Sequence, residues 1–191
     1  MSRESFEHAL ADAARTRARI QAELDQIMGL PLTIARLMGS MRGFHFGTVR
    51  PLARGTGGEY ALHLSCPWRL DHVSGPLTGS DDLWRPADPR DAGPGWDWEE
   101  GETFQERQLG RVLRGFDPAT GSLVNTDPDR LRVKRVEVGD HGEAALYLGG
   151  GYRLVLFPAG AAAEAWRLFR PHEAGRPHFV VEGDGRAGEG G

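Results

Sequence analysis

The chain has 191 residues, of which 39% are hydrophobic, and it contains 27 glycines and 12 prolines. This length suits one domain of the larger common size, and so much glycine and proline favours turn-rich β structure over a helical bundle. The formal net charge of −4 comes from 23 Lys and Arg mixed with 27 Asp and Glu, so nothing in the charge pattern predicts a nucleic-acid partner.

The cysteine content and the lack of long apolar runs indicate where the protein works. Cys66 is the single cysteine, so no intramolecular disulfide can form, and a reducing compartment is expected. No run of 18 or more apolar residues occurs, and acidic residues interrupt the first dozen positions, which argues against a signal peptide. We therefore expect a cytoplasmic protein without a membrane partner.

An amphipathic helix is predicted over residues 2–28, because apolar residues recur there at spacings of three and four. Gly29 and Pro31 follow as a C-terminal stop signal. Packing of this helix on the protein's own sheet is the expected arrangement, and a homodimer formed through the helix is the alternative. The apolar stripe consists of Phe6, Leu10, Ala13, Ile20, Leu24 and Ile27.

Strands are predicted from the alternation of apolar and polar residues. Leu32–Leu37 and Met41–Val49 form two apolar runs around a Gly-Ser turn, and the segment Tyr60–Leu70 alternates. Pro67 should end ladder pairing within that segment, or place it at a sheet edge, because proline has no N–H to donate.

The second half of the chain predicts one short helix and more strands. Thr103 and Glu106 have the spacing of a capping box before an apolar run, and Leu131–Val138 reads as a strand with a bulge at Lys134-Arg135. Four apolar runs between residues 142 and 181, separated by Gly or Pro turns, predict an antiparallel meander.

These elements predict an α+β fold, in which the N-terminal amphipathic helix packs on a mostly antiparallel sheet of about seven strands. Residues 1–182 form the expected single domain. Residues 183–191 have no apolar residue except Ala187, so they predict a disordered Gly-rich tail.

The segment Asp71–Gly101 is rich in Asp, Gly and Pro and predicts an ordered surface loop anchored by tryptophans. Its carboxylates could bind a sugar or act as acid and base beside the aromatic rings; alternatively, they form a solvated acidic face that docks a basic partner. Trp and Arg often dominate interfaces, and both occur together in the dipeptides Trp68-Arg69, Trp84-Arg85 and Trp166-Arg167. The alternative is that each Trp faces inward and each Arg outward, since adjacent residues of a strand face opposite sides. The candidate binding residues are Trp68, Arg69, Asp81, Asp82, Trp84, Arg85, Trp96 and Trp98.

No catalytic residue, metal site or cofactor site is predicted. His63 and Cys66 have ligand-like spacing, but on an extended strand they face opposite sides, and no second ligand pair exists. There is no G-x-S-x-G motif, and Gly149–Gly151 joins two strands as a hairpin turn rather than opening a helix as a phosphate loop would.

Two segments carry a resemblance to known proteins. Gly58–Leu70 and Tyr152–Pro171, together with His178–Val181, resemble a group of uncharacterised bacterial proteins from GC-rich genomes. The second segment is also similar to the ends of small immunity proteins of bacterial polymorphic toxin systems. This resemblance implies a protein partner and brings no catalytic residues.

Three hypotheses follow from the sequence. The first is a non-enzymatic protein-binding module, immunity-like, in which the acidic loop and a sheet face dock a partner. The second is a small-ligand-binding or hydrolytic protein, and the third is a structural homodimer through the N-terminal helix. The ligand hypothesis uses Asp81, Asp82 and His72 in a pocket lined by Trp68, Trp84 and Trp96.

Overall fold

Two antiparallel sheets form the centre of the computed structural model, which describes residues 3–190 without the side chains of Arg3, Glu4, Phe6 and Ala9. In spatial order, the eight-stranded sheet consists of β15 (Ala187–Gly190), β14 (His178–Glu182), β13 (Glu164–Phe169), β5 (Tyr60–Leu64), β2 (Met41–Phe46), β1 (Leu32–Met38), β9 (Ser122–Asn125) and β8 (Arg114–Asp117). The five-stranded sheet consists of β10 (Val133–Val138), β11 (Ala144–Leu148), β12 (Tyr152–Leu156), β6 (Trp68–His72) and β7 (Gly75–Gly79). A small hairpin, β3 (Arg50–Pro51) and β4 (Thr56–Gly57), completes the strands.

The inner faces of the two sheets share one hydrophobic core. Phe44 on β2 meets Trp68 on β6 edge to face, with 5.2 Å between the ring centroids. Trp166 on β13 is completely buried and donates its indole N–H to the carbonyl of Gly142 at 2.9 Å. Because each sheet has one apolar face, stacking the two faces removes both from water.

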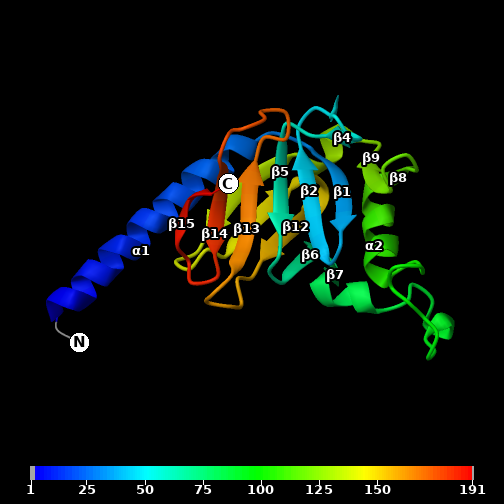
Figure 1. Ribbon diagram of the computed structural model, residues 1–191, viewed down its shortest axis with the longest axis horizontal. Helices are drawn as coiled ribbons and strands as arrows, with labels where there is room; N and C mark the ends of the chain where they lie inside the picture. The colour runs from blue at the N-terminus through cyan, green and yellow to red at the C-terminus, as the bar shows by residue number, and fades with distance from the viewer. Residues whose placement is uncertain (1–2, 191) are drawn as a thin grey trace.

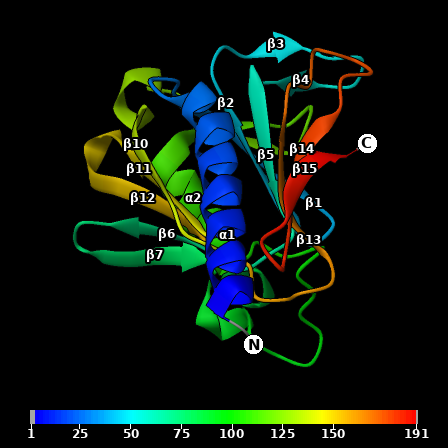
Figure 2. The ribbon, with the colours of Figure 1, turned by 90° about the vertical axis from the view of Figure 1, so that its left-hand side faces the viewer.

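The two helices close opposite open sides of this sandwich (Figure 2). The first, α1 (Arg3–Leu24), continues into a 3₁₀ turn (Asp25–Ile27) and contacts the edge strands β10 and β15, while α2 (Phe104–Leu113) contacts β7, β8 and β9. Neither helix is both long enough and apolar enough to cross a membrane, within residues 3–190.

Among the described side chains of the predicted stripe, those at its C-terminal end are buried. Ile20, Leu24 and Ile27 are completely buried, whereas Leu10 is 55% exposed, and the N-terminal half of α1 extends beyond the sheets (Figure 1). Phe6 belongs to the predicted stripe, but its side chain lies outside the described residues. The helix therefore covers the gap between two sheets rather than the face of one.

The α+β class is confirmed, and the strand arrangement is corrected. One sheet of about seven strands was expected, and the structure has sheets of eight and five strands instead. The expected meander over residues 142–181 is also divided: its four runs are strands, but β11 and β12 belong to one sheet and β13 and β14 to the other. The chain passes between sheets after β12, near the point where Pro67 separates β5 from β6.

Three local predictions are confirmed, and two are corrected. The β1–β2 pair, the register shift between Val133 and Arg135, and the short helix capped by Thr103 are present. The expected loop Asp71–Gly101 instead begins with the end of β6, followed by β7 and a 3₁₀ helix (Ser80–Trp84). The tail also differs from the expected disorder: in residues 183–190 it forms a turn and β15, whose backbone pairs with β14 without needing apolar side chains.

Candidate protein-binding surface

Residues 80–106, here called the acidic loop, leave the body of the protein and return to it at one point. The N–H of Ala87 donates to the carbonyl of Glu102 at 2.8 Å, and that of Phe104 donates to the carbonyl of Arg85, also at 2.8 Å. Leu83 and Ala87 are buried and anchor the base of the loop. The part between these closing bonds projects from the molecule, at the lower right of Figure 1.

Two tryptophans pack together on the acidic loop. Trp84 and Trp98 meet edge to face with 5.1 Å between centroids, and Trp84 remains 53% exposed. Trp96 is half-buried and lies close to Gly101, where an added Cβ would come within 2.6 Å of the indole nitrogen. Gly101 therefore lets the chain turn tightly over an aromatic ring, and the loop has its own small packed centre.

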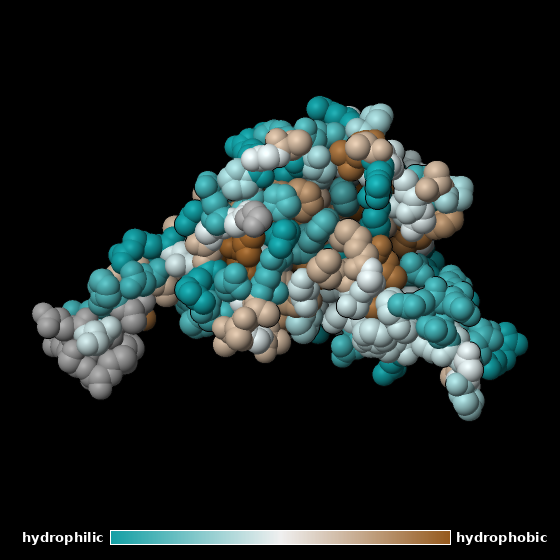
Figure 3. Space-filling model, in the orientation of Figure 1, coloured by the Kyte–Doolittle hydropathy of each residue, from teal (hydrophilic) through white to brown (hydrophobic). Residues whose placement is uncertain are grey.

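The acidic loop carries most of the molecule's charge imbalance. It holds nine Asp and Glu against two arginines, a net −7, whereas the whole chain carries −4, so the other residues sum to +3. Hydrogen bonds from Arg90 lower the pKa of Asp88, and Arg107 pairs with Glu102 at 2.8 Å. Figure 3 shows this projection as mainly hydrophilic. Such a single-sign surface attracts a basic partner and repels an acidic one.

A hollow of about 430 Å³ separates the acidic loop from the turn between β1 and β2. Trp98 lies on one side of it and Leu37 on the other. Its remaining lining is mainly acidic: Gly39, Glu99, Glu100, Gly101, Glu102 and Glu106. Carboxylates around an aromatic ring suit a cationic side chain, which can pair with the acids and stack on the ring.

The predicted binding residues fall into two neighbouring groups. Trp84, Trp96 and Trp98 form one group on the acidic loop. Asp81 and Asp82, at the start of the same loop, line a groove together with Arg69 of β6, and Arg85 lines the continuation of this groove. Trp68 is only 4% exposed and packs on Phe44, so most of its ring belongs to the core.

Arg69 is engaged within its own sheet. Its guanidinium donates to Asp71 at 2.6 Å, and Arg153 donates to the same carboxylate at 2.8 Å. Burial alone would raise the pKa of Asp71, but the hydrogen bonds from the two arginines outweigh it and lower that pKa.

His72 does not join the acids that the ligand hypothesis grouped with it. It lies opposite Gly75 at the turn end of β6, whereas Arg69, near Asp81, pairs with Gly79 at the other end. The His72 ring bonds to Ser74 Oγ at 2.8 Å and packs on Tyr152. His72 therefore lies too far from Asp81 and Asp82 to form an acid–base pair with them.

Sequence reasoning did not single out two exposed aromatic residues near the loop. Phe157 is 40% exposed, and Phe104 is half-buried; both line the groove that contains Asp81. Phe157 follows the last residue of β12 and precedes Pro158. A large apolar residue just outside a strand was the one sequence feature that indicated its exposure. Phe104 belongs to the apolar run that follows the predicted helix cap, and that pattern does not reveal its partial exposure.

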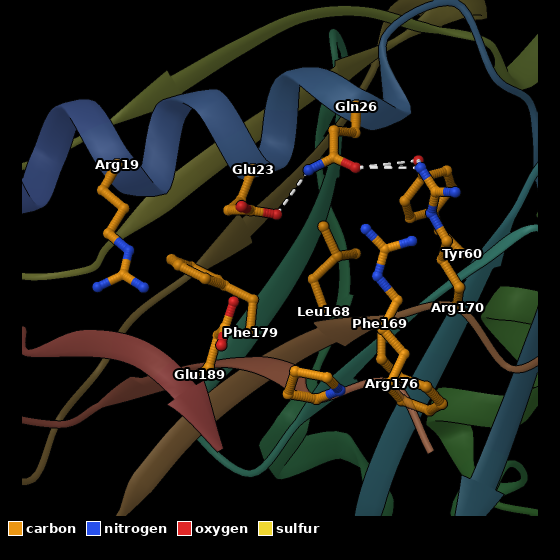
Figure 4. Close-up of a pocket in the computed structure, with 11 residues that line it drawn as sticks. Arg19, Glu23, Gln26, Tyr60, Leu168, Phe169, Arg170, Arg176, Phe179 and Glu189 are labelled. Carbon is orange, nitrogen blue, oxygen red and sulfur yellow. Dashed lines mark hydrogen bonds between the residues drawn. The ribbon is translucent and has the colours of Figure 1, made fainter. Parts of the chain in front are cut away.

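A smaller hollow of about 110 Å³ lies between α1 and strands β13–β15 (Figure 4). Its polar side chains hydrogen-bond to one another: Tyr60 donates to Gln26 at 3.1 Å, Gln26 donates to Glu23 at 2.6 Å, and Arg170 donates to Tyr60. This hollow is therefore a polar joint between α1 and the eight-stranded sheet, with its hydrogen-bonding capacity largely used.

Histidines gather on the outer face of the eight-stranded sheet rather than around Cys66. The ring centroids of His45 and His63 are 6.2 Å apart, and His178 stacks on Phe169 at 4.1 Å. Cys66 lies in the core, where burial raises the pKa of its thiol to about 11. Within the described part of the chain, no three His, Cys, Asp or Glu side chains form a group suited to a metal ion.

Comparison with protein-family models, with curated protein sequences and with solved structures found no match to this chain.

Proposed function

We propose that this protein is a non-enzymatic protein-binding module that uses the acidic loop to dock a basic surface of a partner protein. The observation that carries the proposal is the net charge of −7 on residues 80–106, combined with the Trp84–Trp98 pair, of which Trp84 is 53% exposed. Acidic side chains accelerate and orient the encounter, and aromatic rings supply apolar contact once water is displaced. An immunity-like role, neutralising a toxin by binding it, is our proposal from the resemblance of the C-terminal segments.

The decisive experiment compares the parent with a loop variant, Asp97→Asn/Glu99→Gln/Glu100→Gln, as bait in pull-downs from the native host. The matched control neutralises three acids outside the loop, Glu137→Gln/Glu143→Gln/Glu189→Gln. We expect one specific protein on the parent and the control, released by raised salt and lost from the loop variant. The purified partner should then bind the parent directly.

Two outcomes would contradict this proposal. One is equal retention of the partner on the loop variant. The other is recovery of no specific protein while a small molecule raises the melting temperature of the parent, which would favour the ligand-binding alternative.

A homodimer through α1 is a second candidate function, favoured by the exposure of Leu10 on the half of the helix that extends beyond the sheets. Light scattering of the parent should then give twice the chain mass of 20.9 kDa, and Leu10→Glu should give a monomer. Ala14→Glu, an exposed position on the same helix, is the control. A parent that is already monomeric rejects this function.

We also propose that the protein works in the bacterial cytoplasm. Cys66 supports a reducing compartment, because it is the single cysteine and its buried thiol has no disulfide partner in this chain. Fractionation of the native host would test this placement, and recovery of the protein outside the cytoplasmic fraction would reject it.

A further inference from the structure

A groove lies between the base of the acidic loop, which supplies part of its lining, and the end of the five-stranded sheet where β6 begins and β7 finishes. It consists of two hollows of about 480 and 410 Å³ that share Asp82 and Phe104. We call it the apolar groove, and its apolar walls are Pro67, Leu77, Pro86, Pro89, Phe104 and Phe157. Its combined length runs from the β12 end of the sheet to the base of the acidic loop.

The apolar groove is a rigid apolar surface left open to solvent. Phe157 is 40% exposed, and Leu77 and Phe104 are half-buried. Phe157 N–H donates to the carbonyl of Pro67 at 2.8 Å, which fixes the backbone of Phe157 at one wall. Prolines on both hollows restrict the backbone, so little conformational freedom is lost when a ligand binds.

The charges along the apolar groove select its occupant. Asp82 is already used, because it accepts from Thr78 Oγ1 at 3.1 Å and from the N–H of Gly79 at 3.0 Å. Asp81 is exposed, and within residues 3–190 its side chain makes no hydrogen bond or ion pair, so its carboxylate is available at the rim. Arg69 is engaged by Asp71, a carboxylate that it shares with Arg153. Arg85 lies at the other end, inside a loop whose net charge is −7.

We propose that the apolar groove binds an extended peptide segment of the partner, with an apolar side chain against Phe104 and Phe157 and an Arg or Lys beside Asp81. This inference rests on the proposed function and names the chemistry of the segment recognised next to the acidic loop. An extended segment suits the shape, because the two hollows share Asp82 and Phe104 and both are open to solvent.

Selection of displayed random twelve-residue peptides on the immobilised protein tests the inference. The parent should enrich peptides that carry an aromatic or aliphatic residue close to an Arg or Lys. Phe157→Ser should weaken binding of the enriched peptides about 10-fold or more, since it removes one of the two phenylalanine contacts of the groove. Phe116→Ser is the matched control, because Phe116 is 61% exposed on β8, and it should bind as the parent does.

The Asp81→Asn variant tests the charge, with Asp127→Asn as the control. The former should weaken binding about 3- to 10-fold and relax the preference for Arg or Lys, and the latter should do neither. Failure to enrich a peptide class, or equal binding by the parent and Phe157→Ser, overturns the groove. Peptides that depend on Glu99 and Glu100 but not on Phe157 would also overturn the groove while leaving the acidic loop as the docking site.

Discussion

Arg42 is a buried cation whose hydrogen-bond partner is neutral. It is 1% exposed on β2, its Nε donates to Gln105 Oε1 at 2.9 Å, and burial lowers its pKa to about 10. Gln105 in turn donates to the carbonyl of Gly79 at 2.8 Å. One amide side chain on α2 thus joins the eight-stranded sheet to the end of β7, and it also solvates a charge that water cannot reach.

Gln105→Ala should therefore destabilise the protein by about 3 kcal/mol, because the Arg42 charge would be left buried and unpaired. Urea unfolding measures this loss. Gln108→Ala, on the same helix, should cost less than about 0.5 kcal/mol. Arg42→Met/Gln105→Leu should recover most of the loss, since an apolar pair needs no hydrogen bond. A Gln105→Ala variant as stable as the parent would contradict this account.

His45 is a second buried polar residue. It is 3% exposed; its Nδ1 accepts from the N–H of Gly58 at 3.3 Å, and its Nε2 has no partner among the described residues. Burial, with smaller contributions from Arg36 and His63, lowers the pKa of His45 to about 3. Burial likewise lowers the pKa of His63 to about 4.

These two histidines make stability depend on pH. The unfolded chain takes up protons near pH 6.5 and the folded protein only near pH 3 to 4, so stability falls as pH is lowered from 6.5. For His45 the loss reaches about 2 kcal/mol by pH 5. His45→Asn retains an acceptor for Gly58, and it should flatten the free energy of unfolding between pH 5 and 6.5; the exposed His141→Asn should not. Identical slopes in all three proteins would reject the assignment.

At the scale of elements, the start of α2 is set by Thr103, a buried N-cap residue. Thr103 is completely buried, and its hydroxyl accepts from the N–H of Glu106 at 3.1 Å. The same residue pairs with Pro86 in an isolated bridge that closes the acidic loop. The cap therefore sets both the start of the helix and the base of the proposed docking surface.

Thr103→Ala should cost about 1 to 2 kcal/mol, because the Glu106 N–H would lose its acceptor in a buried site. Thermal unfolding followed by circular dichroism measures the effect, and Thr126→Ala, at an exposed position, is the control. Proteolysis within residues 88–101 should also become faster in Thr103→Ala. A melting temperature equal to that of the control would show that the hydroxyl contributes little.

Elements whose signals are local were predictable from the sequence. The Thr103 cap follows from a hydrogen bond between residues close in sequence, and the β-bulge before Arg135 follows from an interruption in the alternation of apolar and polar residues. Short strands rich in glycine, such as β7, β8 and β15, were missed because their side chains carry no alternation that a pattern could reveal. For the candidate site, the acidic loop was predictable from composition, whereas the apolar groove needed Phe104 and Phe157 to be brought together from distant segments.

At the scale of the whole molecule, both sheets depend on one core. Trp68 from the five-stranded sheet and Trp166 from the eight-stranded sheet belong to the same buried cluster, and α1 and α2 seal its sides. Neither sheet can keep its apolar face from water without the other.

The protein should therefore unfold in one cooperative transition. To remove the signal of the acidic loop, the variant Trp84→Phe/Trp96→Phe/Trp98→Phe would be used, so that fluorescence reports on the core residues Trp68 and Trp166. Circular dichroism and fluorescence should then give the same midpoint in urea. Two separated midpoints would show that the sheets unfold independently, in contradiction to a shared core.

The sequence by itself determined the α+β class, most strand positions, the two helices and the acidic character of the central loop, since each depends on residues close together in the chain. Only the tertiary structure decided that the strands divide between two sheets and that most of Trp68 is buried. It also decided that the half of α1 bearing Leu10 extends beyond the sheets. The reason is physical: alternation specifies that a strand buries one face, but the partner for that face is chosen by packing between residues far apart in sequence.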